Sequence, residues 1–138
     1  DTDVADVLSS EIVTRIKPSP EQYRAMSLGW RLVKYVKSNA ILFSNENQLL
    51  GIGAGQMSRV DSVKIAIRKV RESGLSLDGA AMASDAFFPF PDCLEIAAEA
   101  GISSVVQPGG SIKDKQVIDM ADDLGLSMVF TKMRHFYH

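Results

Sequence analysis

The sequence contains few of the residues on which metal and thiol chemistry depend. It has one cysteine, Cys93, and its two histidines, His135 and His138, both lie within the last four residues. A single cysteine excludes an internal disulfide, and the Pro-Cys-x-x-Cys and His-x-Glu signatures of zinc deaminases are missing. A Ser-His-Asp hydrolase would need a Gly-x-Ser-x-Gly turn, which does not occur. We therefore expect no metal cofactor.

Strong charge and long apolar runs are also missing. Fifteen basic and 17 acidic residues leave a net charge of −2, so no excess of basic residues points to nucleic acid. No apolar run is long enough to cross a bilayer, and no signal-peptide pattern opens the chain. We expect a cytoplasmic domain with neither nucleic acid nor membrane as partner. Its 138 residues, 46% of them apolar, suffice for one core.

The pattern of apolar residues and caps predicts an alternation of helices and strands. Ser19, Pro20 and Gln22 form a capping box at a helix start, and Ser58 with Asp61 forms a second such signal. The expected helices are 20–37, 59–73, 91–100 and 111–124, and the expected strands are 40–43, 49–52, 79–83, 102–106 and 126–130. The first two strands form a hairpin. This order predicts a three-layer α/β/α sandwich with a mixed sheet, preceded by a leading segment, 1–18, from a longer chain.

A glycine motif, Gly51-Ile52-Gly53-Ala54-Gly55, lies between a predicted strand and a predicted helix. A dinucleotide-binding turn would need its third glycine at position 56, where Gln56 stands. The glycines therefore favour close approach of the backbone to a ligand or to a neighbouring helix. Arg59, just past the motif, either holds an anionic group or is a solvated residue at the start of a helix.

The segment 82–92 concentrates three aromatic side chains, two prolines and two carboxylates at a junction between a strand and a helix. Phe87 and Phe90 are able to line a dry pocket for a planar heterocycle, with Asp92 in the first turn of the next helix. The alternative is an aromatic cluster that closes the core.

Three further segments carry polar groups suited to a ligand. In Gln107-Pro108-Gly109-Gly110-Ser111, backbone amides and the Ser111 hydroxyl either hold a carbonyl or an anion, or cap a helix with Asp114. Asn39 is a turn residue or an amide that faces a ligand. Near the end of the chain, Arg134 has a planar guanidinium suited to phosphate, and His138 carries the terminal carboxylate.

Five segments in this order resemble the C-terminal part of the bifunctional purine-synthesis family, AICAR transformylase/IMP cyclohydrolase. They are Lys37-Ser38-Asn39-Ala40-Ile41, the stretch from Gly51 to Asp61, Ser84-Asp85-Ala86-Phe87-Phe88-Pro89-Phe90, Gln107-Pro108-Gly109-Gly110-Ser111 and Arg134-His135-Phe136-Tyr137-His138. The resemblance covers nearly everything after Pro18. It makes residues 19–138 the C-terminal subdomain of the transformylase region, with a cytidine-deaminase-like fold that has lost its zinc site.

The resemblance implies transfer of a formyl group from 10-formyltetrahydrofolate, a cosubstrate, to the 5-amino group of AICAR. Asn39 would contact the carboxamide or formyl region, and Asp92 would bind the folate side; these two are the candidate catalytic residues. Arg134 would bind the nucleotide phosphate. The remaining candidates for substrate binding, which line or complete the pocket, are Phe87, Phe90, Arg59, Ser111 and His138.

The sequence departs from the family pattern in one respect. The family's catalytic Lys-His pair lies in the first half of the transformylase region, and no Lys-His dipeptide occurs here. The resemblance also implies a homodimer with active sites between subunits, so this chain would hold only part of a site. Other parts of the same enzyme would complete it, and the isolated chain should be inactive. A non-catalytic nucleotide-binding or assembly module of the same fold is the alternative.

Overall fold

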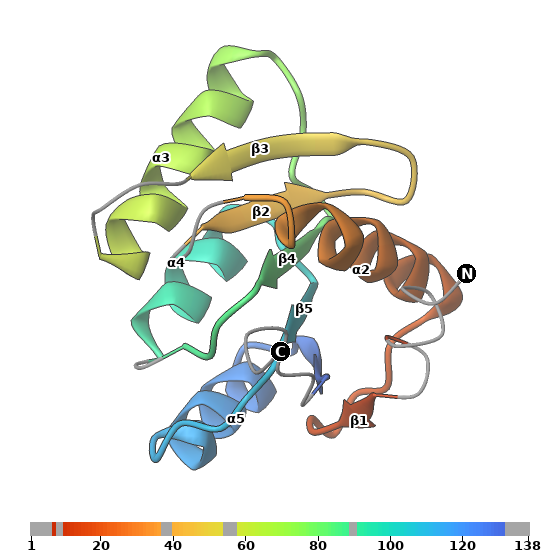
Figure 1. The fold of residues 1–138 in the computed structure, drawn as a ribbon, viewed down its shortest axis with the longest axis vertical. Helices are drawn as coiled ribbons and strands as arrows, with labels where there is room; N and C mark the ends of the chain where they lie inside the picture. The colour runs from red at the N-terminus through yellow and green to blue at the C-terminus, as the bar shows by residue number, and fades with distance from the viewer. Residues whose placement is uncertain (1–6, 8–9, 37–39, 54–57, 89–90, 132–138) are drawn as a thin grey trace.

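The architecture is a six-stranded mixed sheet covered by helices on both faces (Figure 1). The computed structural model describes residues 7, 10–36, 40–53, 58–88 and 91–131. The helices are α2 (Pro20–Val33), α3 (Arg59–Glu72), α4 (Asp92–Glu99) and α5 (Asp114–Asp123). The strands are β1 (Glu11–Ile12), β2 (Ile41–Ser44), β3 (Leu49–Gly53), β4 (Ala81–Ser84), β5 (Ser104–Gln107) and β6 (Ser127–Phe130).

The order of strands in the sheet is β1-β6-β5-β4-β2-β3. Strands β4, β5 and β6 run parallel to one another, as expected for strands joined through helices. The β2–β3 hairpin adds to β4 in the antiparallel sense, and β1 adds to β6 in the same way at the other end. The predicted mixed sheet and hairpin are confirmed.

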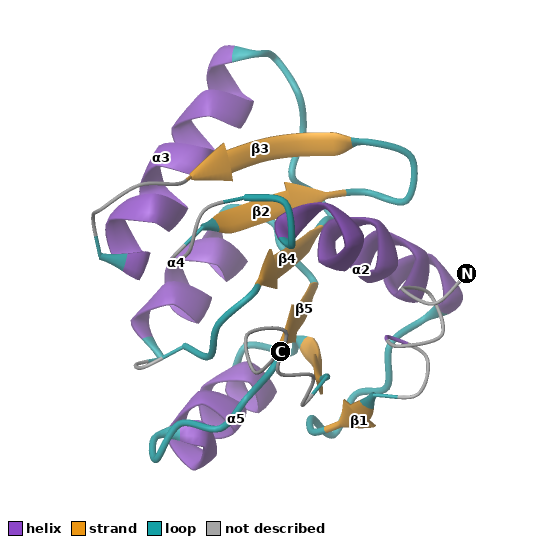
Figure 2. Cartoon of the chain, in the orientation of Figure 1, coloured by secondary structure: helices purple, strands orange, loops and turns teal. Residues whose placement is uncertain are grey.

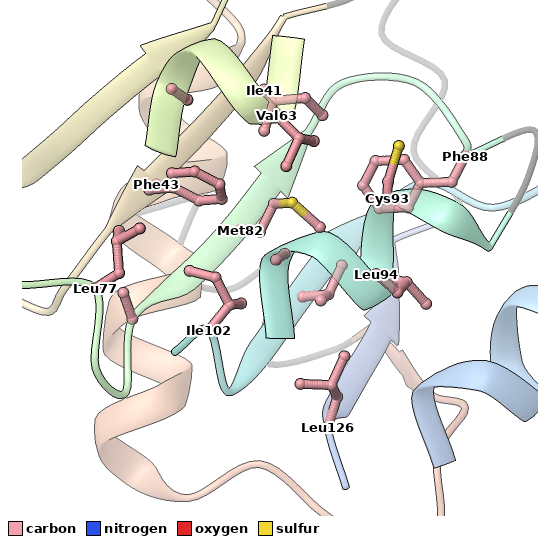
Figure 3. Packing of buried hydrophobic residues seen from close by; sticks show 14 of the residues in the cluster. Ile41, Phe43, Val63, Leu77, Met82, Phe88, Cys93, Leu94, Ile102 and Leu126 are labelled. Carbon is pink, nitrogen blue, oxygen red and sulfur yellow. The ribbon is translucent and has the colours of Figure 1, made fainter. Parts of the chain in front are cut away.

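Two apolar cores lie on opposite faces of the sheet, since successive residues of a strand point to opposite sides. Leu42, Ala83, Val106 and Val129 pack under α2 with Met26 and Trp30. Their strand neighbours Phe43, Met82, Val105 and Met128 pack against α3, α4 and α5. Figure 2 shows these layers, and Figure 3 shows Phe43, Met82 and Leu94 within the second core. The three-layer sandwich predicted from the sequence is confirmed.

The predicted capping box at the start of α2 is present. The Ser19 hydroxyl accepts a hydrogen bond from the Gln22 backbone at 3.1 Å, and the Gln22 side chain accepts one from the Ser19 backbone at 2.9 Å. The same Gln22 amide also bonds the hydroxyls of Ser103 at 3.1 Å and Ser127 at 2.9 Å. One side chain thus joins the helix start to residues at the beginnings of two parallel strands.

The end of α2, the start of α5 and the presence of β1 differ most from the prediction. Helix α2 ends at Val33 and is followed by a turn, whereas the apolar stripe predicted a helix to about residue 37. Helix α5 begins at Asp114, three residues after the predicted start: the Asp114 carboxylate bonds the amides of Gly110 and Ser111, and residues 112–113 form a turn before the helix. Strand β1 was not predicted, since two residues carry no periodicity.

Candidate functional site

The described parts of four of the segments that the sequence analysis singled out lie at one edge of the sheet. The carboxyl ends of parallel strands share an edge, and here β4, β5 and β6 end at Ser84, Gln107 and Phe130. Because β2 runs the opposite way, it begins at this edge, where Ile41 pairs with both Ser84 and Gly53. Strand β3 therefore also ends there (Figure 1). Ligands of open α/β sheets commonly bind at the carboxyl ends of the strands, so this carboxyl edge is the candidate site.

Close packing of a helix explains the first two glycines of the motif. A Cβ at Gly53 would overlap the carbonyl oxygen of Ser62 in α3, and one at Gly51 would lie 2.6 Å from Val70 Cγ2 and 3.0 Å from the Ala66 carbonyl oxygen. The interpretation of backbone approach is confirmed for these two, and the neighbour is a helix. Residues 54–57 lie outside the described part.

The loop after β4 separates its two adjacent phenylalanines. Phe88 is fully buried in the core beneath α4, whereas Phe87 is 41% exposed at the carboxyl edge. The alternative interpretation, an aromatic cluster that closes the core, thus holds for Phe88, which fixes the loop to the core. That Phe87 lines a pocket for a heterocycle stays a prediction. Phe90 lies outside the described residues.

Gln107 holds this loop in place, a role that the sequence analysis did not assign to it. Its side chain is fully buried at the end of β5, and its Oε1 accepts a hydrogen bond from the Phe88 backbone at 3.1 Å. Its Nε2 contacts the sulfur of Met128 at 3.5 Å. The Ser84 hydroxyl adds a 2.7 Å bond to the Ala86 carbonyl. The sequence contained one signal for this role, because Gln107 is a polar residue at the end of an otherwise apolar strand.

Arg59 connects α3 to the same loop. It is the first residue of the helix, is half-buried, and donates a hydrogen bond from Nη1 to the carbonyl oxygen of Phe87. Burial lowers the pKa of Arg59 from its ordinary value, and the nearby Cys93 thiol acts in the opposite direction. The guanidinium is thus a partly desolvated cation at the carboxyl edge, where it is able to attract an anionic group.

Cys93, on the first turn of α4, is a buried neutral thiol. Burial raises its pKa to about 11, with Arg59 lowering it and Asp92 raising it to smaller extents. A thiol with this pKa is a poor nucleophile and a poor metal ligand at neutral pH. No group of three or more His, Cys, Asp or Glu side chains with metal-site geometry occurs among the described residues. A zinc site of the deaminase type therefore does not fit the donors seen here.

Asp92 and Ser111 both adjoin the carboxyl edge. Asp92 is exposed in the first turn of α4, as predicted from its position after Pro91. The Asp114 carboxylate accepts hydrogen bonds from the backbones of Gly110 at 2.8 Å and Ser111 at 3.1 Å. These two amides are therefore already bonded and do not form an open anion-binding turn. The Ser111 hydroxyl, which accepts from Lys113 at 3.0 Å, still has its proton to donate.

The remaining predicted site residues, Asn39, Arg134 and His138, lie outside the described residues. Residues next to them in sequence are placed at the edge: Ala40 precedes β2, and Thr131 donates a hydrogen bond from its backbone to the Gln107 carbonyl at 2.9 Å.

Two surface hollows of about 500 and 450 Å³ lie elsewhere, one between α3 and α4 and one beside α2. Neither is lined by Arg59, Phe87, Asp92 or Ser111.

Solved structures identify the class of fold as deaminase-like. The chain superposes on a diaminohydroxyphosphoribosylaminopyrimidine deaminase/5-amino-6-(5-phosphoribosylamino)uracil reductase from Thermotoga maritima, with TM-score 0.54, 16% identity and 69% of this chain and 30% of that chain covered. It also matches dCMP deaminase from cyanophage S-TIM5, with TM-score 0.51, 18% identity and 75% of this chain and 91% of that chain covered. These likenesses show the fold alone.

None of the described helices has the length and apolar character needed to span a membrane.

The chain belongs to the AICARFT/IMPCHase bienzyme family, whose profile matches residues 1–69. Two relatives, both called bifunctional purine biosynthesis protein PurH, agree with this assignment. The protein from Desulfitobacterium hafniense (strain DSM 10664 / DCB-2) is 56% identical over 128 residues, 93% of this chain and 24% of its own length. The protein from Chlorobium phaeobacteroides (strain BS1) is 51% identical over 138 residues, 100% of this chain and 26% of its own length. The chain thus spans about a quarter of these relatives.

Proposed function

We propose that this chain is the C-terminal subdomain of the transformylase region of a bifunctional purine-synthesis enzyme. The reaction is formyl transfer from 10-formyltetrahydrofolate to the 5-amino group of AICAR. The observation that carries the proposal is that the described parts of four motif-bearing segments, between residues 40 and 111, lie at one edge of the sheet although they are spread over about 70 residues of sequence. Packing alone does not require polar and aromatic residues from these four segments at a single edge.

The groups at this edge match the needs of the two substrates. The AICAR amine is a weak nucleophile because its lone pair is delocalised into the ring and carboxamide, so the reaction depends on positioning, proton removal and polarisation of the formyl group. The exposed ring of Phe87 supplies an apolar surface for a heterocycle. Arg59 supplies a cation and Ser111 a hydroxyl donor, and Asp92 supplies a carboxylate for amino groups of the folate.

Asn39, Phe90, Arg134 and His138 complete the proposed set from sequence alone. Asn39 would bond the carboxamide or formyl group, Phe90 would line the heterocycle pocket, and Arg134 would bind the nucleotide phosphate. The chain carries no Lys-His pair, so other parts of the enzyme, in a homodimer, would supply the proton-transfer groups. The isolated chain should therefore show no formyl transfer.

The two activities of the full-length enzyme provide the test. Asp92→Asn and Phe87→Ala should each lower kcat/KM for formyl transfer about 10- to 1,000-fold and leave IMP cyclohydrolase activity within about twofold. Lys69→Ala, on the exposed side of α3, is the matched control and should change neither activity. Loss of cyclohydrolase activity alone would assign the region to the other reaction. Retention of both activities in both variants would favour a non-catalytic module.

A further inference from the structure

A groove of about 500 Å³ lies between α3 and α4, and none of the candidate site residues lines it. Ile67, Ile96 and Ala100 supply its apolar part. Lys64, Arg68 and Arg71 line the α3 side, spaced so that they follow one stripe of the helix. Glu72 and Glu99, from the last residues of α3 and α4, lie at one end. The groove is therefore basic along one wall and acidic at one end.

The charge of α3 is unusual for this chain. The helix contains five of the chain's 15 basic residues and only two of its 17 acidic ones, in a sequence whose net charge is −2. Arg68 lies 3.9 Å from Glu72, but both side chains are about two-thirds exposed, so this pair contributes little to folding. Lys64 and Arg71 make no ion pair within the described part of the chain. Their charges are available to a partner.

We propose that the α3–α4 groove binds a segment of the same protein that lies outside these 138 residues. The segment carries acidic side chains that meet Lys64 and Arg71, aliphatic side chains that cover Ile67 and Ile96, and a basic side chain that meets Glu99. This chemistry complements the charges and the apolar floor of the groove. The proposal does not depend on which reaction the carboxyl edge serves.

The length of the relatives favours a segment of the same protein over a separate partner. This chain is about a quarter of their length, so roughly three-quarters of such a protein is available to pack on it. Interfaces between domains of one chain are more polar than those of obligate dimers, and this groove combines an apolar floor with a basic wall and two glutamates at one end. A tethered segment also acts at an effective concentration of about millimolar, which suits a shallow, partly charged groove.

Carbodiimide cross-linking of the full-length protein tests the proposal directly, because the reagent joins an ammonium to a carboxylate in contact with it. We expect mass spectrometry to find Lys64 joined to an Asp or Glu outside residues 1–138. Lys69, on the same helix but not in the groove, is the matched control and should form no such link. The Lys64 link should weaken several-fold at 0.5 M salt, since ion pairs at an interface are screened.

A pair of variants supplies a second measurement. Lys64→Glu with Arg71→Glu should raise amide hydrogen exchange in α3 and in the cross-linked segment at least about fivefold in full-length protein, whereas Lys69→Glu should leave both unchanged. Mixing isotopically labelled and unlabelled protein distinguishes links within one chain from links between copies. Links of Lys64 only to a second copy, links only within residues 1–138, or the same amide exchange in the Lys64→Glu/Arg71→Glu variant and in Lys69→Glu would each overturn the proposal.

Discussion

The guanidinium of Arg59 donates a hydrogen bond to the carbonyl of Phe87, a residue 28 positions further along the chain. This bond ties the start of α3 to the loop that follows β4, so the two segments occupy fixed positions at the carboxyl edge. Because the donor is charged and half-buried, the bond should be stronger than an ordinary one between neutral groups. The position of the exposed Phe87 ring therefore depends on a side chain of a different element.

Replacing Arg59 should loosen that loop before it affects the fold. Loss of a charge-assisted hydrogen bond costs about 1.5 to 3 kcal/mol, so Arg59→Ala should speed amide exchange at residues 85–88 about 10- to 100-fold. Hydrogen-exchange mass spectrometry of the full-length protein measures this change, with Lys69→Ala as the control on the same helix. Equal exchange in the wild type and the Arg59 variant would show that the loop is held by Gln107 and Ser84 alone.

Gln107 should be costly to replace with an apolar residue of similar size. Gln107→Leu leaves the buried Phe88 amide without its acceptor, and an unsatisfied buried donor costs about 1 to 3 kcal/mol. Gln116→Leu, at an exposed position of α5, is the control and should change the free energy of unfolding by less than about 0.5 kcal/mol. Urea unfolding compares the two. A neutral Gln107→Leu result would mean that water replaces the side chain.

Gly53 should not tolerate even a methyl group. In Gly53→Ala the new Cβ overlaps the Ser62 carbonyl, which is backbone and cannot rotate away, so α3 must move from β3. We expect a loss of about 3 kcal/mol in the free energy of unfolding, at the upper end of overpacking effects. Leu49→Ala, on the same strand but 39% exposed, should cost less than half as much. Equal costs would indicate that α3 shifts easily.

The Cys93 thiol should react slowly in the folded protein. With its pKa raised from 9.0 to about 11, it carries about 100-fold less thiolate at pH 8 than an unperturbed thiol. Alkylation by iodoacetamide should therefore be at least about 100-fold slower in native protein than in urea. If the two rates were similar, Cys93 would have to be exposed by frequent local opening.

The same shift makes stability depend on pH above 9. The unfolded thiol loses its proton near pH 9, whereas the folded thiol keeps it to about pH 11, so the stabilisation is complete below pH 9 and is lost as the pH rises between these values. The loss between pH 8 and 10.5 should be about 2 kcal/mol from this group. Subtracting the unfolding free energy of Cys93→Ala from that of the wild type at each pH separates the contribution of Cys93 from those of other titrating residues.

The sequence predicted the elements whose signals are local. The capping box at Ser19, the Ser58 cap and the β2–β3 hairpin were all found where side-chain chemistry or alternation had placed them. Strand β1 was missed because two residues carry no pattern and form a strand only through β6. The start of α5 was misplaced because the Ser111 hydroxyl accepts from Lys113 within a turn, and the Asp114 carboxylate binds the amides of Gly110 and Ser111 ahead of the helix.

The candidate site was predictable as a set of motifs but not as an arrangement. Sequence order alone does not show that β2 runs against β4, and this antiparallel pairing is what places Ile41 beside Ser84. The motif residues Arg59 and Gln107 were visible, but their bonds to the Phe87–Phe88 loop join segments 28 and 19 residues apart and depend on packing. The functions of all eight candidate site residues stay predictions from the sequence, and Asn39, Phe90, Arg134 and His138 also lie outside the described residues.

The Gln22 side chain makes three hydrogen bonds, with Ser19, Ser103 and Ser127, and these couple the folding of α2 to that of the sheet. A capping box is usually a local device that forms within one turn of helix, yet here the same amide contacts Ser103 and Ser127, which are 81 and 105 residues away. The helix start and the entry to two parallel strands are thus one cooperative unit. A peptide of residues 18–34 would underestimate the contribution of this cap, because most of its partners would be missing.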